Sequence, residues 1–328
     1  MHSRDFFLIC VACAAGAFGV ALLIGNDYAF FAGYVVLQFI VLAQAWNILG
    51  GYTGYVNFGS AAFFALGAYA TVFFHKLHPL PIPLLMLIGG GVSGLAGLGM
   101  GYLALRLRGA FFAIATLALA VVLQTLVVNW SYVGGARGAY VLRPESVWLI
   151  GSYVHYLFLL MLALAVLAIM TARTIERSRL GYGFATIRDD ELAAESSGVP
   201  TLRLKLIATT LSGAFMGMAG APFPYYIGYV QPASAFGLDY AVNAIAMPMI
   251  GGTGTWIGPL VGAILVASLQ QWASVTFSSE LGLLVVGLLL VGFVVVAPGG
   301  IVGLARKCLA AALSAARIGA RPKRADAP

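Results

Sequence analysis

The chain has 328 residues, of which 61% are hydrophobic and 9% are charged, and its mean hydropathy is +0.97. Soluble domains are typically about 45–50% apolar and about 25% charged, so this composition excludes a water-soluble protein and indicates a polytopic membrane protein. The net charge is +7. The three cysteines, Cys10, Cys13 and Cys308, have no second group of ligands nearby, and we interpret them as small packing residues.

Ten apolar segments come close to the roughly 20 residues that a helix needs to cross the hydrocarbon of a bilayer. They cover 6–25, 29–49, 53–74, 82–105, 110–130, 151–172, 204–227, 239–251, 256–277 and 281–298. The first is longer than an ordinary signal-peptide core and holds Asp5, so we interpret it as a retained helix. The shortest, 239–251, fits a broken or re-entrant segment packed inside the protein. The predicted fold is an all-α transmembrane bundle.

The basic residues predict how this bundle is oriented. If the N-terminus is cytoplasmic, 15 of the 18 lysines and arginines fall on inner connections, and only Lys76, Arg137 and Arg143 fall outside. Because loops rich in Lys and Arg stay inside, both termini are expected in the cytoplasm. We predict a transmembrane domain over 1–304. The basic tail over 305–328 is expected to contact anionic lipid headgroups and not nucleic acid.

One central segment is unusually polar. The window 176–205 holds ten charged residues, and the predicted topology makes 173–203 the longest cytoplasmic loop. The spacing of its apolar residues predicts a short surface helix over 184–197 that ends at Gly198, because a glycine commonly terminates a helix in the left-handed conformation. The alternative interpretation is a solvated connector whose charges only keep it in water.

This segment, "FATIRDDELAAESSGV", resembles the cytoplasmic coupling motif of ATP-binding-cassette importer permeases, in which Glu-Ala-Ala is followed by glycine after three intervening residues. Ala193, Ala194 and Gly198 match that spacing, whereas Leu192 stands at the usual glutamate position and Glu191 is displaced by one residue. Further stretches resemble the branched-chain amino acid (LIV-type) permeases of the LivM kind. They are "NILGGYTGYVNFGSAAFFALGAY", "LRLRGAFFAIATLALA", "IGGTGTWIGPLVGA" and "APGGIVGL", in the expected order.

The resemblance implies a permease subunit of an importer in the bacterial inner membrane, which translocates leucine, isoleucine or valine delivered by a periplasmic binding protein. It also implies a companion LivH-like permease and two cytoplasmic ATPases of the LivG and LivF kind. The residues expected to couple this chain to the ATPases are Arg188, Glu191, Ala193, Ala194 and Gly198. The chain itself lacks the phosphate-loop pattern Gly-x4-Gly-Lys-Ser/Thr, so ATP is expected on the partners, with no cofactor and no enzymatic activity here.

Two glycine clusters, 50–54 and 251–254, each precede a renewed helix, and broken helices of this kind can expose backbone groups to a small solute. The residues expected near the translocation pathway or its gate are Asn47, Gly54, Asn57, Ser60, Thr116 and Asn243. Ser60 departs from the family pattern, in which relatives usually carry histidine. Each amide could instead serve only as a hydrogen bond between helices. No histidine set suggests a metal site.

Other functions stay open at this point. Related permeases carry urea, amides or aromatic acids, and selectivity in such importers is largely delegated to the binding protein. An ion-coupled secondary carrier would need ionisable groups inside the membrane, and no Asp, Glu, Lys or Arg lies in the middle of a predicted span. A membrane-embedded enzyme would need a cluster of His, Asp, Glu or Cys residues at one depth, which the sequence does not show.

Overall fold

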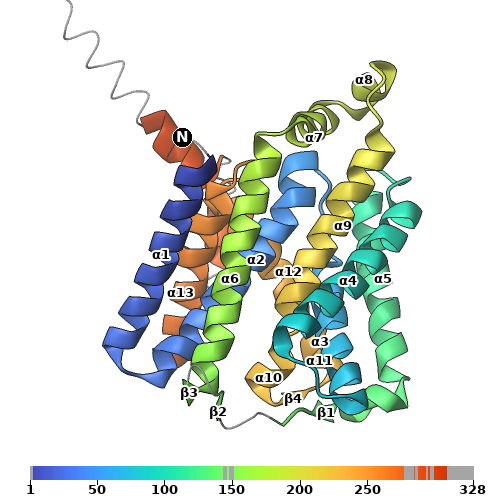
Figure 1. The fold of residues 1–328 in the computed structure, drawn as a ribbon. Helices are drawn as coiled ribbons and strands as arrows, with labels where there is room; N and C mark the ends of the chain where they lie inside the picture. The colour runs from blue at the N-terminus through green and yellow to red at the C-terminus, as the bar shows by residue number, and fades with distance from the viewer. Residues whose placement is uncertain are drawn as a thin grey trace, which may run out of the picture.

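The computed structural model describes residues 3–142, 146–147, 151–276, 284, 287–292, 295 and 299–308. Within these residues the chain is a helical bundle with eight spans long and apolar enough to cross a membrane, which confirms the all-α polytopic fold (Figure 1). The long helices are α1 (Ser3–Ile24), α2 (Asp27–Thr53), α3 (Ser60–Leu77), α4 (Ile82–Ala104), α5 (Ala110–Val128), α6 (Tyr153–Glu176), α9 (Thr201–Gly220) and α13 (Ile257–Thr276).

Short elements close the two ends of the bundle. Helices α7 (Arg179–Asp189) and α8 (Glu191–Ser196) lie above the helix ends in Figure 1, and we call this the upper end. The lower end carries α10 (Phe223–Ile227), α11 (Pro232–Ala235), the 3-10 turns η1 (Ser131–Val133) and η2 (Gly135–Arg137), and four two-residue strands. Strand β1 (Ala139–Tyr140) pairs antiparallel with β4 (Tyr229–Val230), and β2 (Ser146–Val147) pairs with β3 (Gly151–Ser152).

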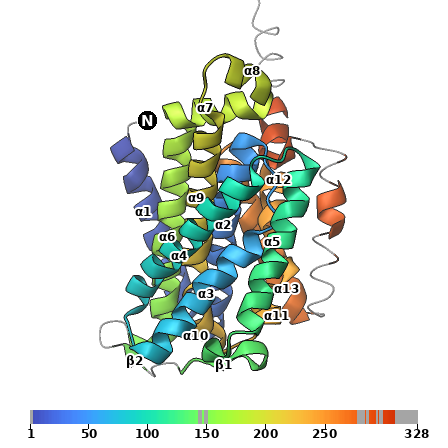
Figure 2. The same cartoon turned by 90° about the vertical axis from the view of Figure 1, so that its right-hand side faces the viewer.

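The weakest predicted span is a short helix surrounded by protein. Helix α12 (Leu238–Gly251) has 14 residues and is therefore about 21 Å long, less than the roughly 30 Å of a hydrocarbon core. It packs mainly against α13 and α2 (Figure 2). The predicted span 281–298 falls almost entirely outside the described residues.

The break after α2 comes later than predicted. Helix α2 continues through Gly50 and Gly51 to Thr53, and the chain unwinds only at Gly54, whose φ of +79° is the left-handed conformation that glycine adopts without steric cost. The next helix starts at Ser60 and not at residue 53. The predicted break around residues 50–54 includes Gly54, but the predicted helix end at 49 is four residues early and the predicted restart at 53 is seven residues early.

Helices α3, α4 and α9 meet along glycines. A Cβ atom at Gly67 or Gly217 would overlap a backbone carbonyl of the facing helix, and one at Gly89 would lie 3.1 Å from the Gly217 carbonyl oxygen. Ser93 of α4 adds a hydrogen bond across this contact, with its hydroxyl 2.8 Å from the Phe63 carbonyl oxygen. Small residues allow such close approach, which matters in lipid because the hydrophobic effect does not drive helices together there.

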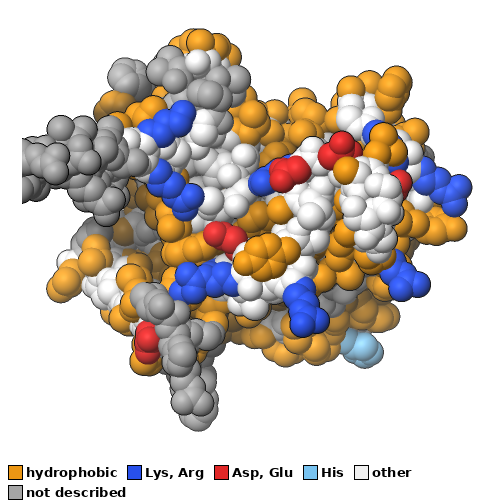
Figure 3. Space-filling view, turned by 90° about the horizontal axis from the view of Figure 1, so that it is seen from above, with side chains coloured by type: hydrophobic (Ala, Val, Ile, Leu, Met, Phe, Trp, Pro, Cys, Tyr) orange, Lys and Arg blue, Asp and Glu red, His pale blue; other side chains and the backbone are white. Residues whose placement is uncertain are grey.

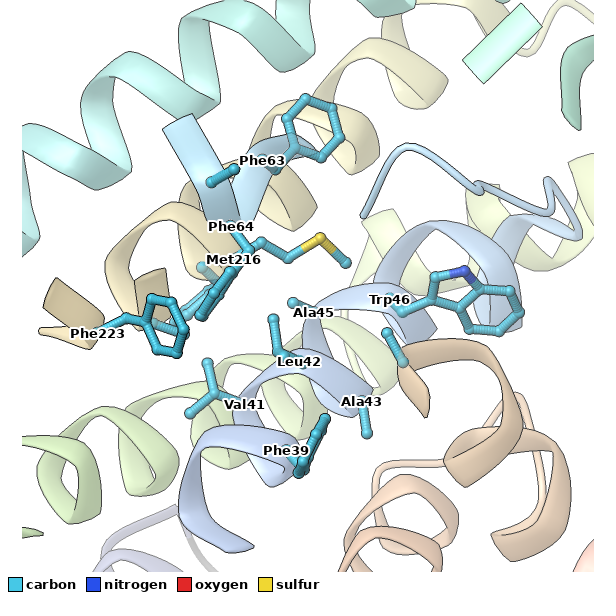
Figure 4. Close-up of a cluster of buried hydrophobic side chains, with 14 of the residues drawn as sticks. Phe39, Val41, Leu42, Ala43, Ala45, Trp46, Phe63, Phe64, Met216 and Phe223 are labelled. Atoms are coloured by element: carbon cyan, nitrogen blue, oxygen red, sulfur yellow. The ribbon is translucent and has the colours of Figure 1, made fainter. Parts of the chain in front are cut away.

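Part of the main cluster of buried apolar side chains lies where α2, α3, α9 and α10 converge. Figure 4 shows Leu42, Phe64, Met216 and Phe223 within it. The rings of Phe64 and Phe223 pack edge to face with their centroids 5.1 Å apart. Since lipid is as apolar as these side chains, the cluster gains stability from the many close van der Waals contacts and not from leaving water.

We expect Gly217→Ala to destabilise the bundle, because the new methyl group has no room between α9 and α4. Overpacking of this kind costs about 1–3 kcal/mol. The matched control is Gly91→Ala on α4, where a Cβ atom meets nothing within 4 Å. Thermal unfolding of the two purified variants checks the prediction, and equal melting temperatures would contradict it.

Nearly all described basic residues lie at the upper end. They are Arg106, Arg108, Arg173, Arg177, Arg179, Arg188, Arg203, Lys205, Arg306 and Lys307, whereas Lys76 and Arg137 lie at the lower end. Figure 3, viewed from above, shows blue and red side chains scattered over this face. The positive-inside rule therefore predicts that the upper end faces the cytoplasm.

This orientation is testable with single cysteines in a background without Cys10, Cys13 and Cys308. A cysteine at Ser131, exposed at the lower end, should react with an impermeant thiol reagent added to intact cells. One at Ser196, exposed on α8 at the upper end, should be protected until the cells are opened. Labelling of both positions from outside would contradict the predicted topology.

Candidate functional site

The charged segment forms two short helices where one was predicted. Asp190 separates α7 from α8 with extended backbone angles, φ −160° and ψ 108°. Its Oδ1 atom accepts hydrogen bonds from the amides of Leu192, at 2.9 Å, and Ala193, at 3.1 Å, so it is the N-cap of α8. An aspartate that bonds to nearby amides competes with helix continuation, which explains the break inside the predicted helix. Gly198, with φ +82°, ends the segment in the left-handed conformation as expected.

A buried ammonium group attaches α8 to the bundle. The Lys205 Nζ atom of α9 lies 2.6 Å from Glu191 Oε1, 3.2 Å from the Tyr55 hydroxyl and 3.1 Å from the Leu105 carbonyl oxygen. The Tyr55 hydroxyl in turn donates to the other carboxylate oxygen of Glu191. We call Tyr55, Glu191 and Lys205 the Lys205 cluster. It joins α8, α9, the end of α4 and the break between α2 and α3.

The electrostatics of the cluster favour the ionised carboxylate. Partial burial raises the pKa of Glu191, but hydrogen bonds from Lys205 and Tyr55 and the charges of Lys205 and Arg108 outweigh burial and hold the pKa below its ordinary value. Burial, followed by the hydrogen bond to Glu191, raises the pKa of Tyr55, so its phenol stays protonated and donates. The Lys205 side chain is only 4% exposed. This is therefore an ion pair inside protein, where removal of one partner leaves an uncompensated charge.

Glu195 provides a second attachment of α8. Its Oε1 atom accepts a hydrogen bond from the Thr201 hydroxyl at 2.8 Å, and its Oε2 atom lies 3.5 Å from the Arg108 guanidinium. Arg108 is half-exposed, so this outer pair contributes less than the buried one. Both acids of α8 thus face the protein's own basic residues. Glu191, predicted to couple the chain to an ATPase, positions α8 on the bundle, and its coupling role stays a prediction.

The opposite face of α8 is free for contact with a partner. Leu192 is 63% exposed and Ala193 is also exposed, whereas Ala194 is only 5% exposed and packs against its own chain. An apolar side chain beside a small one, raised above the bundle on a short helix, is a surface that another protein can approach closely. The structure therefore divides the predicted pair: Ala193 faces outward and Ala194 faces inward.

Arg188, another predicted coupling residue, lies between the two glycine breaks. A Cβ atom at Gly54 would lie 3.2 Å from its Cγ, and one at Gly254 would lie 2.8 Å from its Nη1. Arg188 and Gly54 also line a cavity of about 210 Å³ together with Tyr55, Arg108 and Glu191. A larger residue at Gly54 would therefore displace Arg188 as well as strain the backbone. The base of the charged segment and both helix breaks meet at this point.

Polar contacts hold the second break against α2. Asn47 accepts a hydrogen bond from the Gly254 amide at 3.2 Å and donates to the Thr255 carbonyl oxygen at 3.1 Å. The next residue, Trp256, is bonded on both sides: its carbonyl accepts from Gln44 at 2.6 Å, and its amide donates to Glu176 at 2.9 Å. The turn over 252–256 is thereby fixed to α2 and to the end of α6.

The other predicted pathway residues fall in two places. Asn57, Ser60 and Thr116 lie together at the first break, all buried: Ser60 donates to the Asn57 carbonyl oxygen at 3.1 Å, and Thr116 accepts from the Phe58 amide at 3.1 Å. The Asn57 Nδ2 atom is buried without a hydrogen-bond partner. Asn243 lies apart on α12, where its side chain accepts from Gln270 at 2.9 Å. A role of these residues in translocation stays a prediction.

Sequence reasoning missed Lys205, Tyr55 and Glu176. Lys205 was counted with the basic residues of a cytoplasmic connection, although it is buried. The signal was present, because Lys205 shares its helix face with Ala208, Thr209 and Ser212, all buried at intervals of three, four and seven residues. A lysine on the buried face of a helix, among small residues, needs a buried hydrogen-bond acceptor or carboxylate as its partner. Nothing in the linear sequence identified that partner as Glu191.

The Lys205 cluster makes a prediction about stability. Lys205→Met should cost about 3–5 kcal/mol, because it leaves the largely buried Glu191 carboxylate with only the half-exposed Arg108 guanidinium, 3.8 Å away, as a cationic partner among the described residues. Glu191→Gln combined with Lys205→Met should cost less than the sum of the two single changes, by about 0.5–3 kcal/mol. Denaturant unfolding of the wild type, both single variants and the double variant provides the cycle, and strict additivity would argue against an energetically coupled pair.

The pH dependence gives an independent check. Because the folded pKa of Glu191 lies below its ordinary value of 4.5, the ion pair stabilises the protein above that pH. The stabilisation is lost as the pH falls below 4.5 through the folded pKa. Glu191→Gln should therefore be less stable than the wild type at neutral pH, and the difference should shrink in acid. A difference in melting temperature that does not change with pH would contradict this assignment.

These features define a multi-pass helical membrane protein that presents an anchored pair of short helices at its charged end. The sequence model for the permease component of branched-chain amino acid transport systems matches residues 28–294, and the chain belongs to this family. The predicted resemblance is thus confirmed over most of the chain.

Individual relatives agree with this assignment. The high-affinity branched-chain amino acid transport system permease protein LivM of Salmonella typhimurium is 28% identical over 297 residues, which cover 83% of this chain and 69% of the relative. LivM of Escherichia coli K12 shows the same identity and coverage. The autoinducer 2 import system permease protein LsrC of an Enterobacter species is 27% identical over 203 residues, 58% of this chain and 55% of LsrC. No solved structure matches.

Proposed function

We propose that this chain is the membrane-spanning permease subunit of an ATP-driven importer, which translocates leucine, isoleucine and valine delivered by a periplasmic binding protein. It works beside a companion LivH-like permease in the inner membrane. Two cytoplasmic ATPases supply the energy, and ATP binds to them and not to this chain. The permease family and the LivM relatives support this proposal.

The observation that carries the proposal is the attachment of α8. The helix projects from the charged end, its acids are engaged by Lys205 and Arg108, and Leu192 and Ala193 point outward. A solvated connector does not need a buried ion pair to fix its orientation. A helix that must transmit force between a partner and the bundle does. On this basis α8 is the element that docks in an ATPase cleft.

Docking through α8 can be tested with Ala193→Arg. A charged side chain at a desolvated contact should cost roughly 3 kcal/mol, which weakens association about a hundredfold. The variant should keep its melting temperature, because Ala193 is exposed in the isolated chain. Ala193→Ser, which keeps the residue small, is the matched control. Co-purification of the ATPases measures the effect, and normal recovery with Ala193→Arg would show that α8 is only a connector.

The substrate requires a separate experiment, because the LsrC relative is named for the import of a different solute. The chain, co-expressed with its companion permease, ATPases and binding protein, should take up labelled leucine only when ATP is present. Unlabelled isoleucine and valine should compete, whereas urea, amides and aromatic acids should not. Uptake driven by an ion gradient without ATP would contradict the proposed energy source. Competition only by another solute class would change the substrate and leave the permease assignment intact.

A further inference from the structure

A cavity of about 260 Å³ lies at the upper end of the seam between α1 and α6. Its lining residues are Phe6, Met170, Arg173, Thr174, Arg177 and Ser178. They come from the first turns of α1, the last turns of α6 and the residue that caps α7. The site is separate from the Lys205 cluster and from the cavity beside Arg188. Its described lining residues include two arginines and no carboxylate.

Arg173 is the unusual member of this site. Its side chain is buried, with the residue 6% exposed, and its guanidinium stacks on Phe6 at 3.5 Å and lies 5.9 Å from the Trp256 ring. Within the described part of the chain it forms no ion pair, and its Nη1 atom is buried without a hydrogen-bond partner. A guanidinium has five N–H donors, so burying one without an acceptor is costly unless a ligand supplies the acceptors.

The neighbouring groups determine which ligand fits. Arg177 is exposed at the rim and adds a second positive charge. Ser178 caps α7, an 11-residue helix, and the amides of a first helical turn favour an anion. Glu176, the acid of α6, is not among the described lining residues, and its Oε2 atom accepts a hydrogen bond from the Trp256 amide at 2.9 Å. Two arginines at a helix N-terminus match the charge and the fork-shaped geometry of a phosphate group.

We infer that this cavity binds a phosphate group, and that the ligand is the headgroup of an anionic phospholipid. The lipid source follows from position. Helix α1 lies at the edge of the bundle (Figure 1), and most of its surface is not covered by the rest of the protein. The cavity is lined by Phe6, near the N-terminus of α1. Phe6 and the half-buried Met170 give the cavity an apolar side. The arginines lie at the upper end of the spans, where basic residues are expected to meet anionic headgroups. A free phosphate offers the same chemistry without the acyl chains.

The test uses the full-length chain in nanodiscs. Binding of phosphatidylglycerol, titrated into phosphatidylcholine discs, is measured by native mass spectrometry and by the rise in melting temperature. The variants are Arg173→Gln and Arg177→Gln. The matched control is Arg106→Gln. Arg106 also lies at the upper end and its guanidinium stacks on an aromatic ring, that of Tyr102, at 5.4 Å, but it does not line the cavity. Inorganic phosphate is titrated separately into discs of phosphatidylcholine alone.

We expect Arg173→Gln to weaken phosphatidylglycerol binding at least about tenfold, and Arg177→Gln to weaken it by a smaller factor. Arg106→Gln should bind like the wild type, and inorganic phosphate should give little protection. Equal protection by inorganic phosphate would assign the site to a soluble anion and overturn the lipid source. Unchanged lipid binding in both cavity variants, or an equal loss in Arg106→Gln, would overturn the site. If Arg173→Gln does not fold, Arg177→Gln decides, because its exposed side chain is not needed for packing.

Discussion

The upper end of this protein depends on one buried charge, the ammonium group of Lys205. An unpaired ammonium would be unstable there, so Glu191 and Tyr55 must remain in place as long as the bundle is folded. That requirement fixes the orientation of α8, because Glu191 is its first residue. With its acids turned inward, the helix presents Leu192 and Ala193 to the outside. The surface proposed to meet an ATPase is thus a consequence of an internal ion pair.

The two glycine breaks lie close to the same residue, Arg188, at the base of the charged segment. Gly54 and Gly254 both have left-handed backbone angles. Asn47, which lies on α2 about two helical turns before Gly54, holds the second break against α2 through its hydrogen bonds to Gly254 and Thr255. Glycine is the residue that changes backbone conformation at least steric cost. The chain therefore concentrates its most adaptable backbone where its most polar segment contacts the bundle.

The fold class could be predicted from the sequence, because a run of about 20 apolar residues can be recognised locally without knowing the tertiary structure. It also located the charged segment and the terminating role of Gly198. It could not separate Ala193 from Ala194, since which side of a six-residue helix faces inward depends on the position of Lys205 in space. It also counted Arg173 and Lys205 as ordinary basic residues of one connection. Burial distinguishes them, and burial comes from tertiary packing.

Arg173 and Lys205 are both buried cationic side chains, but they differ in how many of their hydrogen bonds the described residues provide. Lys205 has three oxygen partners from its own chain, and the charge is satisfied internally. Arg173 stacks on Phe6, but among the described residues its Nη1 atom has no hydrogen-bond acceptor, and we propose that a phosphate group supplies one. Trp256 connects this site to the second break, because its ring lies beside Arg173 and its amide bonds to Glu176. A phosphate headgroup bound at Arg173 would therefore be connected, through Trp256, to the same turn that Asn47 holds against α2 and that Arg188 approaches at Gly254.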